Sequence, residues 1–202
     1  MEEKITQKDR TRIQAGIRGK YRKVAQSPGG LFKYPTGRAG LEGLAYDLDQ
    51  IKRLPEPVAA SYCGVGNPFS LGPVNPGDAV LDIGCGAGVD TLIAALMAGP
   101  PGKAVGVDVV PEMLARAEEN RRLTGIENAS FQQASGEKLP FGDGSFDVVI
   151  SNGVINLIPD KASVLKEAWR VLKPGGRLMI ADQMLADAPP RDPAVRIDKW
   201  AQ

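Results

Sequence analysis

The sequence predicts an α/β protein with a doubly wound, mainly parallel sheet, and three observations lead to this class. Five short apolar segments recur from residue 79 onward. Segments with the apolar spacing of helices alternate with them. A glycine-rich turn directly follows the first apolar segment. Strands and helices in alternation form parallel sheets through right-handed crossovers, and such sheets bind ligands at the carboxyl ends of their strands.

The elements of this sheet can be assigned in order. Helices are expected near 89–98, 111–124 and 160–172. Pro111 suits the first turn of the second helix, and Asp160 suits the N-cap of the third. The expected strands are AVLDI, AVGVD, SFQQA, FDVVIS and RLMIAD, at residues 79–83, 104–108, 130–134, 146–151 and 177–182.

The N-terminal part is expected to cover the sheet as a lid. Apolar residues recur at helical spacing among eight Lys or Arg residues, which predicts a basic amphipathic helix over residues 4–24. Nucleic acid or a membrane surface could contact such a helix, but a helix laid over the domain with a solvated charged face is favoured. Residues 27–43 are rich in Gly and Pro and predict a loop or lid. We expect residues 1–70 to lie over the carboxyl ends of the strands.

Composition limits the chemistry. The chain has 202 residues, 43% of them hydrophobic, and a formal net charge of +1, as in an ordinary globular protein. There is no His, and the two Cys residues, Cys63 and Cys85, are expected to be free thiols. A Ser-His-Asp triad, a Cys-His pair and a zinc site of the usual spacing are therefore excluded, and no metal is expected. No run reaches the roughly 18 apolar residues of a membrane span, so a cytoplasmic protein without membrane contact is expected.

The stretch VLDIGCGAG carries the first chemical signal. Gly84, Gly86 and Gly88 let the backbone turn sharply and approach a ligand, at the N-terminus of a helix. A dinucleotide fingerprint needs its third Gly one place later, where Val89 stands, so NAD is disfavoured. Asp108 ends the next strand, where a carboxylate can accept ribose hydroxyls. Together they predict an adenosine-type ligand, although a structural turn and a helix-capping Asp remain alternatives.

These motifs resemble those of the class I S-adenosylmethionine-dependent methyltransferases. DIGCGAG, GVDVVPEM, ASGEKLPF, FDVVISNGV and LKPGG before RLMIAD occur in that family's order across residues 76–184. The resemblance implies a Rossmann-like fold, S-adenosylmethionine as cofactor and a small-molecule acceptor. It also implies a seven-stranded sheet. Only five strands can be assigned, so we expect the last two to be missing and the exposed edge to favour oligomers.

The resemblance implies three parts of the chain and a set of cofactor-binding residues. The parts are an N-terminal helix and lid segment (1–75), the S-adenosylmethionine-binding domain (76–184) and a tail that we expect to be truncated (185–202). Asp82 and Gly84 would face the methionine end of the cofactor, Asp108 the ribose and Met113 the adenine. The whole expected set is Asp82, Gly84, Cys85, Gly86, Gly88, Asp108, Val109, Met113, Ser135, Gly136, Glu137, Ser151 and Asn152.

Within this family, SNGVINLIPDK and SYCGVGNP most resemble arsenite methyltransferases. Those enzymes typically have a Cys in each motif and a third beyond the fifth strand, and the three thiolates hold trivalent arsenic. Here Val65 and Gly153 stand at the first two positions, and the third would lie past Gln202. We expect a pocket for a small, largely apolar acceptor, lined by Tyr62, Cys63, Val65, Gly153 and Asn156.

The acceptor and the catalytic residues stay open at this point. A sulfonium is an activated methyl donor, so an ionised or soft nucleophile needs no general base, and no catalytic residue is assigned. Nucleic-acid bases are not expected as acceptors, because the Asn/Asp-Pro-Pro-aromatic motif of amino-group enzymes is absent. The alternatives are an arsenite methyltransferase proper and a non-catalytic S-adenosylmethionine-binding module.

Overall fold

A five-stranded parallel sheet lies at the centre of the computed structural model, which describes residues 5–184 and Trp200. Its strand order is β3-β2-β1-β4-β5, and every neighbouring pair is parallel. The predicted doubly wound α/β class is confirmed. The strands are β1 (Ala79–Ile83), β2 (Lys103–Asp108), β3 (Ala129–Gln133), β4 (Phe146–Asn152) and β5 (Leu172–Ala181).

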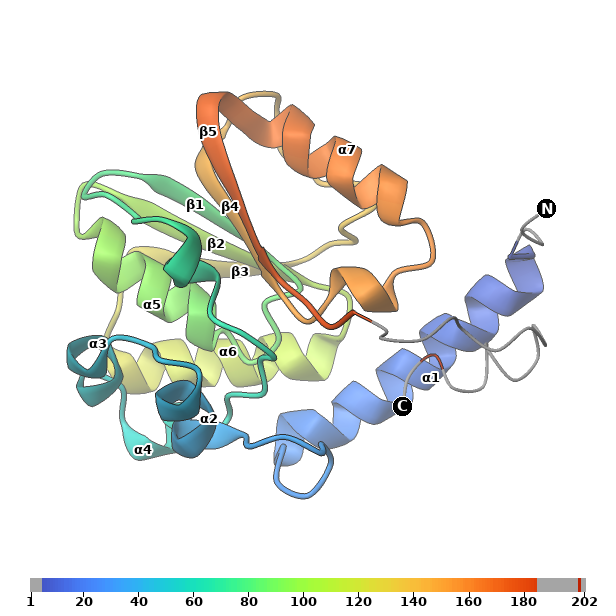
Figure 1. The fold of residues 1–202 in the computed structure, drawn as a ribbon, viewed down its shortest axis with the longest axis horizontal. Coiled ribbons are helices and arrows are strands. Elements are labelled where there is room, and N and C mark those ends of the chain that lie inside the picture. Colours follow the sequence, from blue (N-terminus) through green and yellow to red (C-terminus); the bar gives the residue numbers. More distant parts are fainter. Residues whose placement is uncertain (1–4, 185–199, 201–202) are drawn as a thin grey trace.

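Helices cover both faces of this sheet (Figure 1). α5 (Val89–Ala98) and α6 (Pro111–Thr124) lie on one face, and α7 (Lys161–Val171) lies on the other. Pro111 occupies the first turn of α6, and Asp160 caps α7 by accepting a hydrogen bond from the Ser163 amide at 3.1 Å. The sequence therefore placed all three helices to within one residue at each end.

The core is divided between the two faces. Val80 and Ile150 belong to the apolar cluster on the α5 side, and Leu81 and Val149 belong to the cluster on the α7 side. Successive side chains of a strand point to opposite faces, so a strand covered on both faces needs apolar residues at nearly every position. Each fully buried Leu or Ile contributes about 1.5–3 kcal/mol.

Two sequence expectations need correction. β5 begins at Leu172 rather than Arg177, because Leu172 already pairs with Phe146 before the register shifts and Arg177 pairs with Val148. The intervening Lys-Pro-Gly-Gly residues belong to the strand, and Gly175 has a φ of 80°, which favours glycine. The predicted loop at 27–43 is wrong over its second half, where α2 (Gly37–Gly43) forms.

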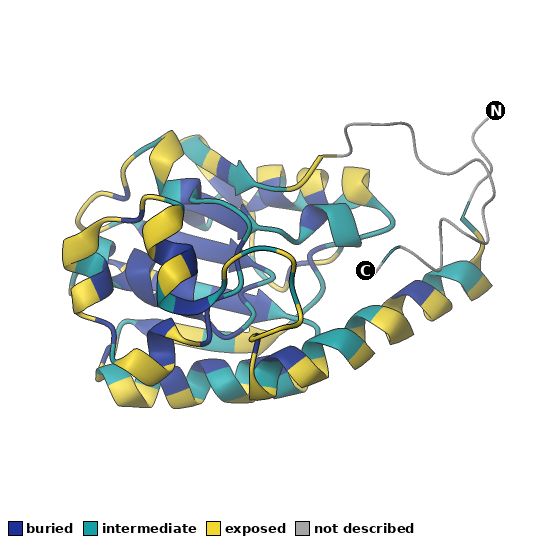
Figure 2. Ribbon diagram, turned by 60° about the horizontal axis from the view of Figure 1, so that its bottom comes forward, coloured by how far each residue is buried: buried dark blue, intermediate teal, exposed yellow. Residues whose placement is uncertain are grey.

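The N-terminal helix, α1 (Gln7–Gln26), is confirmed and ends two residues later than predicted. Thr6 and Asp9 form a capping box at its start. Figure 2 shows α1 along the outside of the domain, where Ile13 and Val24 are buried and the charged face is exposed. Four further short elements were not predicted: α3 (Leu48–Lys52), α4 (Glu56–Ala59), η1 (Pro68–Leu71) and η2 (Ile155–Leu157).

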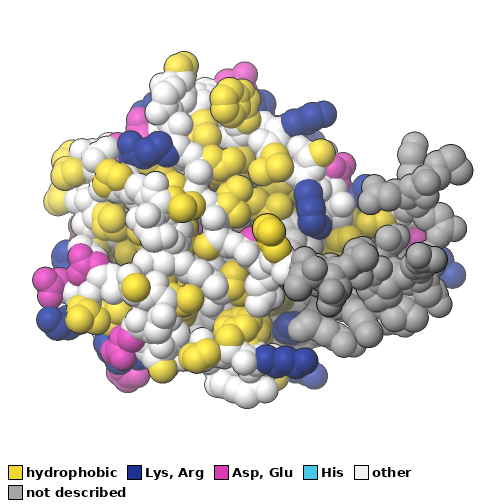
Figure 3. All heavy atoms as spheres, in the orientation of Figure 1, with side chains coloured by type: hydrophobic (Ala, Val, Ile, Leu, Met, Phe, Trp, Pro, Cys, Tyr) yellow, Lys and Arg dark blue, Asp and Glu magenta, His cyan; other side chains and the backbone are white. Residues whose placement is uncertain are grey.

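Among the described residues, β5 has a strand neighbour on one side only. Apolar side chains gather in Figure 3 over the region that β5 crosses in Figure 1, and Leu178 is 36% exposed. The expected oligomer through this edge stays a prediction. The expected tail at 185–202 lies outside the described residues except for Trp200, whose Nε1 donates to the Leu157 carbonyl at 2.8 Å. In the part of the chain that the structure covers, no helix has the length and apolar character needed to cross a membrane.

Candidate functional site

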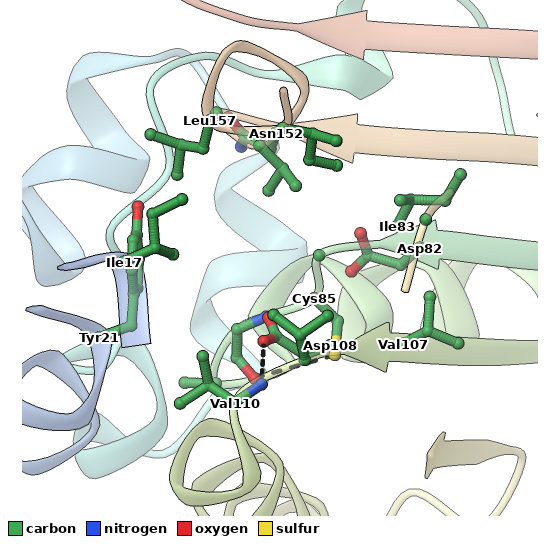
Figure 4. Close-up of a pocket in the computed structure, with 18 of the residues that line it drawn as sticks. Ile17, Tyr21, Asp82, Ile83, Cys85, Val107, Asp108, Val110, Asn152 and Leu157 are labelled. Atoms are coloured by element: carbon green, nitrogen blue, oxygen red, sulfur yellow. Dashed lines mark hydrogen bonds between the residues drawn. The ribbon is translucent and has the colours of Figure 1, made fainter. Parts of the chain in front are cut away.

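A cavity of about 190 Å³ lies at the carboxyl ends of β1, β2 and β4. Figure 4 shows Asp82, Asp108 and Asn152 at the ends of these strands, with Ile17 and Tyr21 of α1 on the opposite side. α1 and residues 61–64 thus lie at the carboxyl ends of the strands, where a lid was expected. The expectation is wrong for α2, α3 and α4, whose buried residues pack in the core cluster on the α5 side. Whether the N-terminal segment opens and closes is a separate prediction.

The glycine loop forms the floor of this cavity. Gly84, Gly86 and Gly88 have φ values of 77°, 53° and 81°, a region that residues with a Cβ rarely adopt. The amides of Gly84 and Cys85 donate to the Val107 carbonyl at 2.8 and 3.0 Å, which fixes the loop beside β2. A Cβ on Gly84 would collide with Val154. The loop therefore needs glycine for its backbone course as well as for access to a ligand.

Asp108 joins the loop to the end of β2. Its Oδ2 accepts from the Gly86 amide and its Oδ1 from the Val110 amide, both at 2.9 Å. Burial raises the pKa of Asp108, and these backbone amides oppose that rise. Each carboxylate oxygen keeps a further lone pair, so both can still accept a hydroxyl group. This is the arrangement that the ribose interpretation requires.

Two more carboxylates line the same cavity. Asp82 is 2% exposed and accepts from the Thr91 hydroxyl at 2.6 Å. Asp90, in the first turn of α5, is 8% exposed and accepts from the Tyr46 hydroxyl at 2.7 Å. Burial raises the pKa of Asp90 to about 6, and burial with repulsion from Asp90 raises the pKa of Asp82 well above its usual value. The two groups share a strongly desolvated, acidic part of the wall.

Asn152 is the centre of a polar network at the end of β4. Its Nδ2 donates to Asp90 Oδ2 at 2.9 Å and also lies 3.2 Å from the Tyr62 hydroxyl. Its Oδ1 accepts from the amides of Val65 at 2.9 Å and Gly66 at 3.1 Å. One side chain thus connects α5 to the segment at 64–66. Asp90 and Tyr46 are parts of this network that sequence reasoning missed.

Most of the predicted cofactor-binding residues come together. Those on the cavity wall are Asp82, Gly84, Cys85, Gly86, Asp108, Val109, Ser135, Gly136, Glu137 and Asn152. Three others do not line it. Gly88 faces Phe131, Met113 is fully buried beneath α1 with Val24 and Val110, and the buried Ser151 hydroxyl donates to the Ile83 carbonyl at 3.0 Å.

The predicted acceptor residues divide between two places. Tyr62, Cys63 and Gly153 line the main cavity. Val65 lines a second cavity of about 180 Å³, and Gly64 lines both. Asn156 lines neither cavity, and its amide donates to Asp182 at 3.0 Å. Among the described residues, no cluster of three or more His, Cys, Asp or Glu could hold a metal ion.

Some lining residues had only weak sequence signals. Gln14, Ile17, Arg18 and Tyr21 follow the helical spacing of one face, so the face was predictable but its contact with the cavity was not. Asp90 lies two residues past the glycine loop, a position from which a side chain can reach the loop. Tyr46 follows no motif, because only the tertiary fold brings it to Asp90.

Comparison with known proteins gives the family. Residues 74–199 match the family described as methyltransferase domain. This chain belongs to that family. An arsenite methyltransferase from Halobacterium salinarum is 42% identical over 154 residues, covering 76% of this chain and 39% of that protein. A demethylmenaquinone methyltransferase from Lactococcus lactis is 41% identical over 103 residues, covering 51% of this chain and 41% of that protein. The chain spans about two fifths of the length of these relatives.

A solved structure supports the same conclusion. The arsenic(III) S-adenosylmethionine methyltransferase from Chlamydomonas reinhardtii superposes with a TM-score of 0.56 at 36% identity, covering 74% of this chain and 50% of that one. The resemblance to class I S-adenosylmethionine-dependent methyltransferases is confirmed. The cofactor of this family is S-adenosylmethionine.

The cavity wall suits that cofactor in its charge. Its described residues include four carboxylates, Asp82, Asp90, Asp108 and Glu137, and one cationic side chain, Arg18. Such a wall disfavours a phosphate-bearing ligand and favours one with positive groups and free hydroxyls. S-adenosylmethionine carries an ammonium group, a sulfonium and two ribose hydroxyls, and it has no phosphate.

Proposed function

We propose that this chain binds S-adenosylmethionine and transfers its methyl group to a small molecule. The observation that carries this proposal is the meeting of the Gly86 amide and the Asp108 carboxylate at 2.9 Å on the wall of an acidic cavity. When bound, the cofactor supplies a methyl group on a positively charged sulfur, which is already activated for transfer. The residues of the chain then have to bind, orient and exclude water.

The roles of these residues follow from their places on the wall. Asp108 would accept the ribose hydroxyls, and Ser135, Gly136 and Glu137 would line the adenine edge. Asp82 would lie at the methionine end. Ile17 and Tyr21 of α1 cover the opposite side with apolar surface, which keeps water from the reacting groups.

The acceptor that fits best is small and largely apolar. Arsenite is less well supported, because Val65 and Gly153 stand where arsenite methyltransferases have cysteines. Cys63 supplies one thiol, and burial raises its pKa to about 12, so it stays protonated at neutral pH. A metalloid ligand must be a thiolate. The relatives include both arsenite and demethylmenaquinone methyltransferases, so a reduced quinone is a reasonable first acceptor to assay.

Two measurements test the proposal. Titration calorimetry should show binding of S-adenosylmethionine and of S-adenosylhomocysteine, with NAD as the negative control. Transfer of a labelled methyl group is then measured with a reduced demethylmenaquinone analogue, with arsenite plus glutathione, and with a panel of small phenols. Binding without any transfer would support the non-catalytic module. Absence of binding would remove the proposal.

A further inference from the structure

Asp82 and Asp90 are two buried carboxylates that face the main cavity, and their placement points to a role beyond stabilising the fold. Both are buried, both line the main cavity, and each repels the other. Their hydrogen-bond partners are all uncharged: Thr91 for Asp82, and Tyr46 and Asn152 for Asp90. Two buried negative charges without a cationic hydrogen-bond partner are costly, and a positive ligand in the cavity removes part of that cost.

Other titratable and charged groups face the cavity that the pair lines. Tyr46, Tyr62 and Cys63 all feel the charge of Asp90, and burial raises the pKa of each, so they stay neutral between pH 5 and pH 8. Asp108 acts on Asp82 through its charge, and Arg18 is the cation among the described wall residues. Because the two carboxylates interact, the proton belongs to the pair rather than to one residue.

We infer that Asp90, acting with Asp82, makes this cavity distinguish the positively charged methyl donor from its neutral product. The inference rests on the proposed function. S-adenosylmethionine has a sulfonium, and S-adenosylhomocysteine has an uncharged thioether in its place. A cation in the cavity favours the doubly ionised pair, so binding of the donor releases the proton that the pair holds. Methyl transfer turns the sulfonium into a thioether and so removes one positive charge from the cavity, and the pair then takes up a proton from solvent.

The coupling between donor binding and proton release can be measured as protons released per site and as a change of affinity with pH. Burial raises the pKa of Asp90 to about 6, so near this pH Asp90 is about half protonated and the donor should release up to about half a proton per site from it. The product keeps the ammonium group but lacks the sulfonium, so it should release fewer protons than the donor. Below this pH each unit of acidification weakens donor binding, so the donor should bind about tenfold more weakly at pH 5 than at pH 7. Binding of the product should weaken by a smaller factor over the same range.

Calorimetry with S-adenosylmethionine and S-adenosylhomocysteine, in two buffers of different ionisation enthalpy at pH 6 and pH 8, measures the protons released. The wild-type protein should show a donor-minus-product difference at pH 6 that disappears at pH 8. Asp90→Asn keeps an acceptor for the Tyr46 hydroxyl and should lose the difference. Asp108→Asn is the matched control, since both ligands carry the ribose and should weaken by the same factor.

A second variant covers the case in which Asp90→Asn does not fold. Tyr46→Phe removes the hydroxyl that donates to ionised Asp90 at 2.7 Å, so the pH of half-maximal proton release should rise. Equal proton release by donor and product in the wild-type protein would overturn the inference, as would a difference that Asp90→Asn retains. Failure of both ligands to bind is a different result, because it removes the proposed function itself.

Discussion

Val65 and Gly153 lie in contact although 88 positions separate them in the sequence (153 minus 65). A Cβ on Gly153 would lie 3.7 Å from the Cβ of Val65. Disulfides need a Cβ to Cβ distance of about 3.5–4.5 Å. The double variant Val65→Cys/Gly153→Cys should therefore form a disulfide under oxidising conditions and present two adjacent thiols when reduced.

The stability of this variant can be worked from the same geometry. Closing a loop of this length stabilises the oxidised protein by about 4.6 kcal/mol in the chain-entropy description. Gly153 has a φ of 70°, and a residue with a Cβ in this region costs about 1–2 kcal/mol. Replacing Val65 by a smaller side chain costs about 1 kcal/mol more. The oxidised variant should be about 2 kcal/mol more stable than the wild-type protein, and the reduced one about 2–3 kcal/mol less stable.

Denaturant unfolding with and without reductant measures both values, and mass spectrometry shows whether the thiols are joined. Gly153→Ala is the control for backbone strain, and each single cysteine variant is the control for a lone thiol. A variant that stays reduced in the presence of oxidant would refute the contact between the two positions.

The same reduced variant tests the acceptor. Two adjacent thiolates should hold arsenite, so methylated arsenic should appear with glutathione in the double variant and be nearly absent with the unmodified protein. Efficient arsenite methylation by the unmodified protein would refute the preference for an apolar acceptor.

Three further results are expected. Asp108→Ala should weaken S-adenosylmethionine binding by about 1–3 kcal/mol, and unchanged affinity in calorimetry would contradict its ribose role. Gly88→Ala should cost about 2–4 kcal/mol in denaturant unfolding, because its Cβ would lie 2.5 Å from Phe131 Cζ at a φ of 81°. Hydrogen bonding to Arg170 lowers the pKa of Glu167 to about 2 from 4.5, so this stabilisation is full above pH 4.5 and declines as the pH falls toward 2. In Arg170→Met the free energy of unfolding should depend less on pH in that range. A pH dependence equal to that of the wild-type protein would contradict stabilisation by this ion pair.

The sheet was predictable because its signals are local. Each strand is a short apolar run, and each crossover helix has its own cap or breaker, such as Pro111 and Asp160. β5 was shortened because Pro174 and two glycines read as a turn, whereas the bulge opposite β4 lets them continue the strand. The short helices α2, α3 and α4 have too few residues for a periodic pattern. Packing against the domain, rather than local preference, decides their structure.

The part of the site that could be predicted from the sequence lies at the ends of neighbouring strands. The glycine loop and Asp108 occupy consecutive strand ends, so their meeting follows from topology alone. Met113 was misplaced because its position in the motif says nothing of α1, which covers it. Tyr46 joins Asp90 across 44 positions, and no spacing rule links them. Long-range polar contacts of this kind depend on the completed fold.

The late position of Asn152 in the chain determines which contacts of the candidate site can form first. The amides of Val65 and Gly66 reach its Oδ1 across 87 and 86 positions, whereas the Gly86 amide reaches Asp108 across 22. Closing a longer loop costs more chain entropy, so contacts distant in sequence form late. During synthesis from the N-terminus, the contact of the glycine loop with Asp108 can form once β2 has emerged, while the bonds from the amides of residues 65 and 66 to Asn152 must wait for β4. Nascent chains halted before residue 152 should therefore hold the glycine loop against Asp108 without the contact between Asn152 and the segment at 64–66.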